Sequence, residues 1–149
     1  MTLTAWTEAS LQNHLARRFN RTGSLCVPNC GVYGWEADLI RVSSRLFVSE
    51  YEIKVIRSDF RNDRKKEWRY IQLEDGERKP NQFWFVAPQG VVPIDELPEF
   101  AGLLEVYSGG ATAVAKVAPK LHRRPIATKD LLYLTRGCAL RYWRSRSER

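Results

Sequence analysis

Apolar residues near the start of the chain recur with the period of an α-helix. Leu11, Leu15 and Phe19 are spaced four residues apart, so they would lie on one face of a helix. Thr7 precedes this pattern and is a residue type that favours the N-cap position. The spacing therefore predicts a helix over residues 7–19.

Shorter apolar runs follow, and their β-branched and aromatic residues predict strands. The expected strands span residues 24–29, 34–42 and 45–56. Pro28 is expected to end the first one, because proline has no N–H to donate to a strand ladder. A tight hairpin at residues 43–45 is expected between the other two.

The polar segment after the third strand predicts a second helix, which is capped by Ser58 or Asp59 and ends near Leu73. This helix is expected to pack through apolar side chains. They are Phe60, Trp68 and Ile71.

The second half of the chain alternates in the same way. A buried strand is predicted at residues 82–88, a hairpin around residues 108–110 and a helix from about Thr128. No repeat or linker divides the chain, so residues 1–149 are expected to form one domain. The order α-β-β-β-α-β, followed by a hairpin and a helix, predicts an α/β fold with a mixed central sheet flanked by helices.

Composition restricts the class of protein. Of the 149 residues, 44% are apolar and 28% are charged, as in soluble globular domains. Without a signal-peptide-like segment or an apolar run of membrane-spanning length, a cytoplasmic protein with no membrane partner is expected. Three cysteines do not make a disulfide framework, and Cys26 and Cys30 lack the second ligand pair that structural zinc needs. The net charge of +7 favours a polyanionic partner, most simply nucleic acid.

One predicted strand carries an unusual row of charges. Glu50, Glu52 and Lys54 alternate along residues 45–56, so their side chains share one face. Glu36 and Asp38 share a face of the preceding strand by the same rule.

The register of the hairpin decides which of these carboxylates meet. A turn at residues 43–45 would place Asp38 opposite Glu50 and diagonal to Glu52, and Glu36 opposite Glu52. Any shift by an even number of residues keeps the same side chains on one face. Carboxylates this close destabilise a sheet unless they take up a proton or hold a cation.

Oxygen ligands at this spacing suit Mg²⁺, with Mn²⁺ as a substitute, because these ions need only one or two carboxylates and keep several waters. Lys54 adds a cation within reach of the same bound water or phosphate, where it can orient the water or neutralise charge. Metal, carboxylates and lysine together are typical of phosphodiester hydrolysis. The alternative is a solvated strand face with ordinary cross-strand ion pairs, and the residues alone leave both open.

The arrangement resembles the PD-(D/E)xK superfamily of restriction-endonuclease-like nucleases. That core has a helix with an acidic residue, a hairpin bearing an aspartate, a (D/E)-x-K strand and a further helix. The matching positions here are Glu8, Asp38 in “WEADLI” and residues 52–54 in “EYEIKV”. The stretches “EYEIKVIRSDFRNDRK” and “KPNQFWFVAPQGVVPIDELPEFAGLLEV” are similar to MmcB-type DNA-repair, VRR-type and Holliday-junction-resolvase-like nucleases. The likeness covers residues 7–106, the expected core, and leaves residues 107–149 as a C-terminal extension.

The resemblance implies a role for each matched residue. Asp38 and Glu52 would be the metal ligands, together with the backbone carbonyl of Ile53. Lys54 would assist the attacking water. Glu8, expected on the inward face of its helix, would reach the metal through water or orient a ligand. The runner-up ligands, which share faces with the first two, are Glu36 and Glu50.

Basic residues crowd the helix that follows the expected metal site. Neutralised phosphates release counterions, so such a helix is suited to hold a DNA backbone, and its N-terminus can receive a phosphate. The alternative is a solvated helix paired with its own carboxylates. The residues expected to contact DNA are Arg57, Ser58, Arg61, Arg64, Lys65, Lys66 and Arg69.

A second basic group lies among the last residues of the chain, where Tyr142 and Trp143 interleave with arginines. Such aromatic side chains can stack on unpaired bases, although they more often pack inside a protein. No base-reading module is recognisable, so structure-selective or nonspecific cleavage is expected.

These observations predict a Mg²⁺-dependent deoxyribonuclease in DNA repair, recombination or phage DNA processing. Its partner would be DNA, with duplex, branched and single-stranded forms left open, and a homodimer is a further open alternative. The rival functions are a DNA-binding protein that keeps the fold without cleaving, and a dimeric Holliday-junction resolvase. A sequence-specific restriction enzyme is disfavoured, because nothing resembles a target-recognition insert.

Overall fold

A computed structural model describes residues 5–148 of the chain and contains one mixed sheet. Its strands are β1 (Leu25–Cys30), β2 (Ala37–Val42), β3 (Val48–Ile53), β4 (Gln82–Pro88), β5 (Ala101–Val106) and β6 (Thr112–Lys116). They lie side by side in chain order. β4 is parallel to both of its neighbours, and the other neighbouring pairs are antiparallel.

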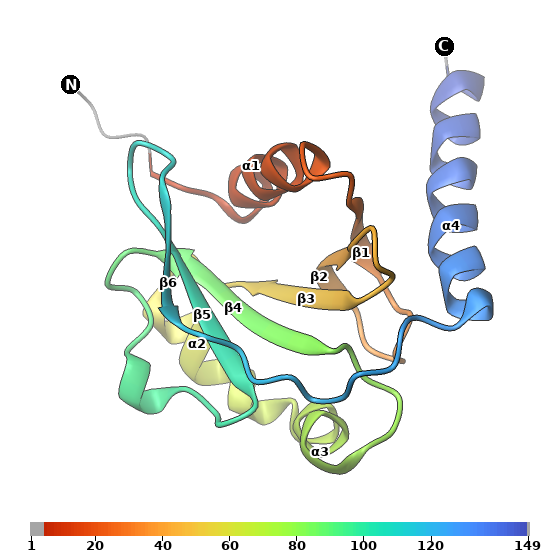
Figure 1. Cartoon of the computed structure of the whole chain (residues 1–149). Coiled ribbons are helices and arrows are strands. Elements are labelled where there is room, and N and C mark those ends of the chain that lie inside the picture. The colour runs from red at the N-terminus through yellow and green to blue at the C-terminus, as the bar shows by residue number, and fades with distance from the viewer. Residues whose placement is uncertain (1–4, 149) are drawn as a thin grey trace.

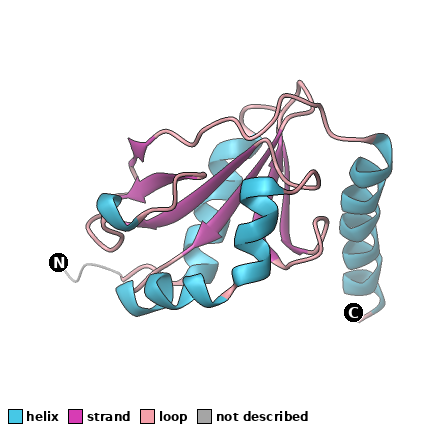
Figure 2. Ribbon diagram, turned by 90° about the horizontal axis from the view of Figure 1, so that it is seen from below, coloured by secondary structure: helices cyan, strands magenta, loops and turns pink. Residues whose placement is uncertain are grey.

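Helices cover both faces of the sheet (Figure 1). One face is covered by α1 (Glu8–Asn20), and the other by α2 (Arg57–Asn62) and α3 (Glu67–Asp75). Two 3₁₀ turns, η1 (Asp63–Lys65) and η2 (Ile94–Glu96), lie in the connections. The long helix α4 (Thr128–Ser147) stands at the β1 side of the molecule (Figure 1), apart from the other helices (Figure 2). The expected α/β class, mixed sheet and flanking helices are confirmed.

The two faces of the sheet are packed by different helices. Leu11 and Leu15 of α1 are fully buried and pack in one cluster with Leu39 of β2. On the opposite face, Phe60 of α2 meets Phe85 of β4 edge to face, with ring centroids 5.2 Å apart. Each such side chain contributes about 1.5–3 kcal/mol by leaving water, so α1 and α2 are both fixed firmly to the sheet.

The start of α1 agrees with the expected cap. The Thr7 hydroxyl accepts the N–H of Ser10 (3.1 Å), and the Ser10 hydroxyl accepts the N–H of Thr7 (2.9 Å). This reciprocal pair is a capping box, which satisfies two N–H groups that a helix otherwise leaves free.

The sequence led us to expect that Pro28 ends the first strand, and this expectation is wrong. β1 continues to Cys30, with Pro28 opposite Leu39 of β2. β1 is an edge strand, and an edge strand tolerates proline because one of its rows of N–H groups has no strand partner.

The second helix is broken, which the sequence did not predict. α2 ends at Asn62, and Lys66 takes φ −85° and ψ 58° before α3 begins. Helix α2 also begins after Ile56, without a side-chain cap from Ser58 or Asp59. The break changes the direction that later side chains face. Trp68 and Ile71 are 52% and 58% exposed, although the Trp68 ring still meets Trp35 edge to face with centroids 5.7 Å apart.

Asn81 fixes the segment that leads to α4. Its Oδ1 accepts the N–H of Val48 (2.8 Å), and its Nδ2 donates to the carbonyls of His122 and Arg124 (2.9 Å each). Asn81 is 5% exposed, so these bonds are shielded from water and hold residues 117–127 against the ends of the strands. Within residues 5–148, no helix combines the length and the apolar character needed to cross a membrane.

Candidate functional site

The turn between β2 and β3 lies one residue later than expected. Ser43 donates its N–H to the carbonyl of Phe47 (2.9 Å), so the loop consists of residues 44–46. Leu46 has a φ of 69°, the left-handed conformation that ends many three-residue hairpin loops.

This turn moves the register of β2 against β3 by two residues. The expected turn would have paired Glu50 with Asp38. In the structure Glu50 pairs with Ile40. An even shift leaves each side chain on its expected face. Asp38 consequently lies at the C-terminal end of β3, where its Oδ2 accepts the N–H of Ile53 (2.8 Å).

A pocket of about 280 Å³ opens at this end of β3. Five carboxylate side chains and two lysines line it, together with an asparagine and an isoleucine. The four residues expected to be catalytic are therefore brought to one place. The lining residues are Glu8, Asp38, Glu52, Ile53, Lys54, Asp59, Asn62, Asp63 and Lys66.

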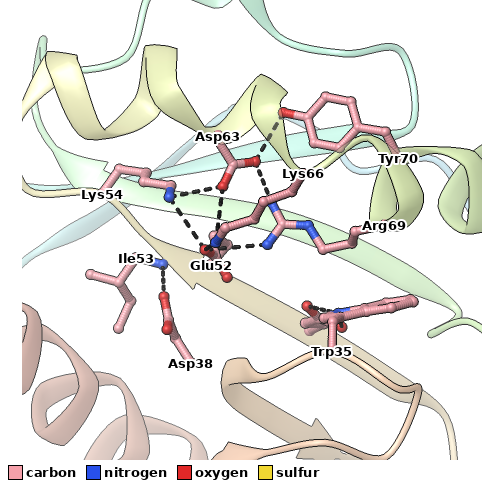
Figure 3. A network of polar contacts seen from close by, with 10 residues as sticks. Trp35, Asp38, Glu52, Ile53, Lys54, Asp63, Lys66, Arg69 and Tyr70 are labelled. Carbon is pink, nitrogen blue, oxygen red and sulfur yellow. Dashed lines mark hydrogen bonds and ion pairs between the residues drawn. The ribbon is translucent and has the colours of Figure 1, made fainter.

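The two oxygens of Glu52 have opposite surroundings (Figure 3). Oε1 lies 3.3 Å from Nζ of Lys54, 3.1 Å from Nζ of Lys66 and 3.3 Å from Nη1 of Arg69. Oε2 is buried and has no hydrogen-bond partner among the described residues. A buried polar atom without a partner costs about 1–3 kcal/mol, so this end of β3 is poised to take a donor or a cation.

Lys54 is held between two carboxylates. Its Nζ is 2.8 Å from Oδ1 of Asp63 and 3.3 Å from Oε1 of Glu52. Burial alone would lower the pKa of Lys54, but Glu52 and Asp63 outweigh burial and raise the pKa. Lys54 is therefore a cation that can hold an anion, and not a base that takes up a proton.

Asp63 belongs to the site, although the sequence analysis did not single it out. Its carboxylate is 1% exposed, pairs with the Arg69 guanidinium and accepts the Tyr70 hydroxyl (2.9 Å). Burial would raise the pKa of Asp63, but Arg69 and Lys54 lower it, so Asp63 is an anion. It turns inward because the helix breaks after Asn62. No glycine or proline marks that break, so the sequence holds no local signal for it.

Burial favours the protonated form of the Asp38 carboxyl group. It raises the pKa of Asp38 to about 7, with a further contribution from the Glu52 carboxylate and opposition from the N–H of Ile53. Near neutral pH this carboxyl group is consequently close to half protonated. A cation beside it would favour the ionised form.

Neither runner-up ligand belongs to the lining that the described residues form. Glu36 is exposed in the loop before β2. Glu50 is fully buried, and both of its oxygens accept the Nε1–H of Trp35 (2.8 and 3.1 Å). Burial raises the pKa of Glu50 to about 8, against the effect of this hydrogen bond.

Glu8 lines the pocket but is exposed, so its expected place on the inward face of the helix is wrong. The buried stripe of α1 begins one turn later, at Leu11. The first turn of α1 therefore borders the pocket mouth from the side, and Glu8 faces the mouth and the solvent.

The donor set fits Mg²⁺. Hard oxygen ligands are present in Asp38 and in the free Oε2 of Glu52. The Ile53 carbonyl points to the same strand edge as its N–H, which binds Asp38. In the part of the chain that the structure describes, no three His, Cys, Asp or Glu side chains form a closed metal cage. Mg²⁺ does not need one, because it keeps several waters and uses one or two carboxylates.

The residues expected to contact DNA divide into an exposed group and one buried member. Arg69 is 2% exposed and paired with Asp63 and Glu52, so its expected contact with a DNA phosphate is wrong. Among the others, Arg57 donates to the carbonyls of Gly90 and Val91. The exposed members are Arg57, Ser58, Arg61, Arg64, Lys65 and Lys66.

Comparison with known proteins identifies the fold but no family. No family model matches the sequence, and no curated protein matches it. The chain is similar to a solved structure of a protein of unknown function from Silicibacter pomeroyi, with a TM-score of 0.66 and 19% identity. The match covers 97% of this chain and 90% of that one, and at this identity it concerns the fold alone.

Proposed function

We propose that the protein is a metal-dependent deoxyribonuclease with a restriction-endonuclease-like core. One observation carries the proposal: the buried, unpartnered Oε2 of Glu52 shares an open pocket with Asp38, and the Lys54 ammonium lies 3.3 Å from the other oxygen of Glu52. A solvated strand face, the alternative interpretation of these charges, does not require buried carboxylates. The element order α1-β1-β2-β3-α2-α3-β4, in which α2 and α3 stand where one helix was expected, also supports the proposed core.

Asp38, Glu52 and the Ile53 carbonyl would hold Mg²⁺, and Mn²⁺ would substitute. When bound, such an ion lowers the pKa of a water and polarises the phosphate. The raised pKa of Asp38 supports this assignment, because a group that is only half ionised alone gains most from a cation. Glu8 would border the same position from α1.

Lys54 would act on the phosphate through its charge. The raised pKa of Lys54 keeps the ammonium protonated, so it donates to a phosphate oxygen and stabilises the negative charge that develops there. Asp63 would be the residue that positions Lys54, and Arg69 in turn fixes Asp63. In this assignment Arg69 supports the site from within and does not touch the substrate.

The DNA backbone would lie along α2 and η1, beside the pocket. Lys66 is half exposed while its Nζ lies 3.1 Å from Glu52, so it links the pocket to the outer surface. Arg61, Arg64 and Lys65 extend this basic surface and would release counterions on binding. DNA repair, recombination and phage DNA processing all supply such a substrate.

The test is cleavage of supercoiled plasmid, single-stranded DNA and a four-way junction, each with Mg²⁺, with Mn²⁺ and with chelator. We expect metal-dependent cleavage that falls by roughly a thousandfold in Asp38→Asn and Lys54→Met. Asp75→Asn, an exposed carboxylate at the end of α3, is the matched control and should retain full activity.

The rival functions predict other results. Symmetric nicks in the four-way junction by a dimeric protein would identify a resolvase. Tight DNA binding without cleavage under any metal would leave a non-catalytic DNA-binding protein. A Mn²⁺ titration followed by electron paramagnetic resonance reports the metal site independently of cleavage, and equal Mn²⁺ affinity in wild type and Asp38→Asn would overturn the assignment of the ligands.

A further inference from the structure

The C-terminal half of α4 projects from the body of the molecule (Figures 1 and 2). Of the α4 residues that the structure describes, Leu134 is the one that is buried. Two turns later, Arg141 donates to the carbonyls of Pro28 and Asn29 (2.6 and 2.7 Å). In the described residues beyond Arg141, the side-chain hydrogen bonds stay within the helix.

Large apolar side chains face water on this helix. Leu132, Tyr142 and Trp143 are 63%, 54% and 60% exposed. Helical periodicity places Leu132 and Trp143 opposite Leu134, the residue that packs on the sheet. Two adjacent exposed rings, Tyr142 and Trp143, mark a binding site more often than an isolated exposed residue such as Leu132 does.

Arginines surround the exposed rings. Tyr142 and Trp143 meet edge to face with ring centroids 5.4 Å apart. The Arg146 guanidinium carbon lies 6.0 and 5.9 Å from the two centroids, and Arg144 is exposed beside them. We call Tyr142, Trp143, Arg144 and Arg146 the aromatic–arginine surface.

We propose that the aromatic–arginine surface binds unpaired nucleotides, so that the substrate of the nuclease contains a single-stranded segment. This rests on the proposed function and names its substrate class. Base faces are available for stacking only where bases are unpaired, and aromatic platforms flanked by cations are how proteins hold single strands. Phosphates between stacked bases would meet Arg144 and Arg146.

Charge argues against a second copy of the chain as the occupant. The described part of α4 beyond Leu134 carries the cations Arg136, Arg141, Arg144 and Arg146, and Glu148 after the helix is the lone carboxylate there. Two such surfaces would bring like charges together, which costs association free energy. A polyanion has the complementary charge.

A chain of contacts connects this helix to the candidate active site. Arg141 binds the carbonyl of Asn29, and the Asn29 side-chain oxygen lies 3.3 Å from Nε2 of Gln12. The same nitrogen of Gln12 donates to the carbonyl of Asp38 (2.6 Å). A strand that leaves the pocket past Asp38 and Asn29 would reach α4 first at Arg141. The matching substrates are an overhang, a flap or a gap.

The test measures binding without cleavage, in chelator, by fluorescence anisotropy of a labelled oligothymidylate of about 16 nucleotides and of a blunt duplex. We expect Trp143→Ala to weaken binding of the single strand by roughly tenfold, and Trp143→Phe to retain most of it. Duplex binding should change less than about twofold, because it depends on the cations of α2 and η1.

Leu132→Ala is the matched control, since it removes an equally exposed apolar side chain from the same helix. The inference is overturned if Trp143→Ala weakens single-strand binding no more than Leu132→Ala does. It is also overturned if wild type is a dimer in sedimentation that Trp143→Ala dissociates.

The result separates this inference from the proposed nuclease. Mn²⁺ affinity of the pocket should be equal in wild type and Trp143→Ala, because α4 supplies none of the pocket-lining residues that the structure describes. Loss of single-strand binding with intact Mn²⁺ binding supports the inference even in a protein that cleaves nothing. Cleavage of blunt duplex at the same rate as a flap, with a functional metal site, would retain the nuclease and reject the single-stranded substrate.

Discussion

Glu50 and Glu52 are two residues apart on β3, share one face of the sheet and are both buried, yet their surroundings differ. Both oxygens of Glu50 accept the same Trp35 N–H. One oxygen of Glu52 meets Lys54, Lys66 and Arg69, whereas the other has no partner among the described residues. Glu50 is closed off by Trp35, whereas Glu52 lines the pocket.

The difference follows from position along the strand. Trp35 in the loop before β2 covers Glu50, whereas none of residues 31–36 lines the pocket at Glu52. Glu52 lies where β3 leaves the sheet, next to the break between α2 and α3. Identical side chains on one face thus acquire different surroundings from the elements that close over them.

The largest effect should come from removing the charge of each glutamate in turn. Glu52→Gln is expected to weaken Mn²⁺ binding by roughly a hundredfold or more and to abolish cleavage, because it removes an ionised oxygen ligand. Glu50→Gln should leave the Mn²⁺ affinity within about threefold of wild type, since Trp35 can still donate to the amide oxygen. Isothermal titration with Mn²⁺ measures both, and equal losses in the two variants would contradict the comparison.

The second effect concerns protein stability and the buried ion pairs of Asp63, next to Glu52. Asp63→Asn should lower the free energy of unfolding by about 3–5 kcal/mol, because it leaves two buried cations, Arg69 and Lys54, with Glu52 as the carboxylate that they share. Urea denaturation measures this loss. Asp59→Asn, an exposed carboxylate in the same pocket lining, should change stability by less than about 0.5 kcal/mol.

The third effect is a pH dependence of the free energy of unfolding. Adding Mg²⁺ should separate the contribution of Asp38 from that of Glu50. Asp38 has a folded pKa of about 7 against an ordinary value of 3.8, and Glu50 a pKa of about 8 against 4.5. Both contributions to stability are complete below the ordinary pKa and are lost as the pH rises through the folded pKa. The lowered pKa of Asp63 acts below about pH 4 and stays outside this window.

Unfolding free energies without metal should therefore fall between pH 5 and pH 9, by at most about 3 kcal/mol for Asp38 and about 4 kcal/mol for Glu50. Asp38→Asn and Glu50→Gln should each remove part of this fall. Mg²⁺ should restore the part that belongs to Asp38 and leave the part that belongs to Glu50. If Mg²⁺ restores neither part, Asp38 is not a metal ligand.

The smallest effect comes from the Trp35 hydrogen bond. Trp35→Phe should lower stability by about 1 kcal/mol at neutral pH, because it leaves buried Glu50 without its donor. Mn²⁺ affinity should stay at the wild-type value. Thermal unfolding at two pH values measures the change, and a larger loss at pH 9 than at pH 6 is the sign that Glu50 is the group affected.

The sequence predicted the parts of the fold that repeat locally. The four-residue spacing of Leu11, Leu15 and Phe19 located α1, and the alternation of Glu52 and Lys54 located one wall of the pocket. The register was predicted wrongly by two residues, but an even error changes no side-chain face. The grouping of Asp38 with Glu52 depends only on that parity, which is why it was predictable.

The predictions that failed concern features that depend on contacts between distant residues. A continuous helix over residues 58–73 would not have brought Asp63 and Arg69 together, because residues six apart do not face each other. The break that does so is stabilised by Lys54, on another element. Pro28 is tolerated because β1 is an edge strand, and position in a sheet is not written in the local sequence.

The hydrogen bonds of the Asn81 side chain, called here the Asn81 clamp, have a consequence for synthesis of the chain. Its amide joins Val48 to the carbonyls of His122 and Arg124, so the clamp closes only after residues up to 124 have left the ribosome. Domains begin to fold while translation continues, and β1 to β5 can assemble earlier. The Asn81 amide would stay hydrated until residues 122–124 arrive, and α4, whose Leu134 packs on the sheet, would dock after them.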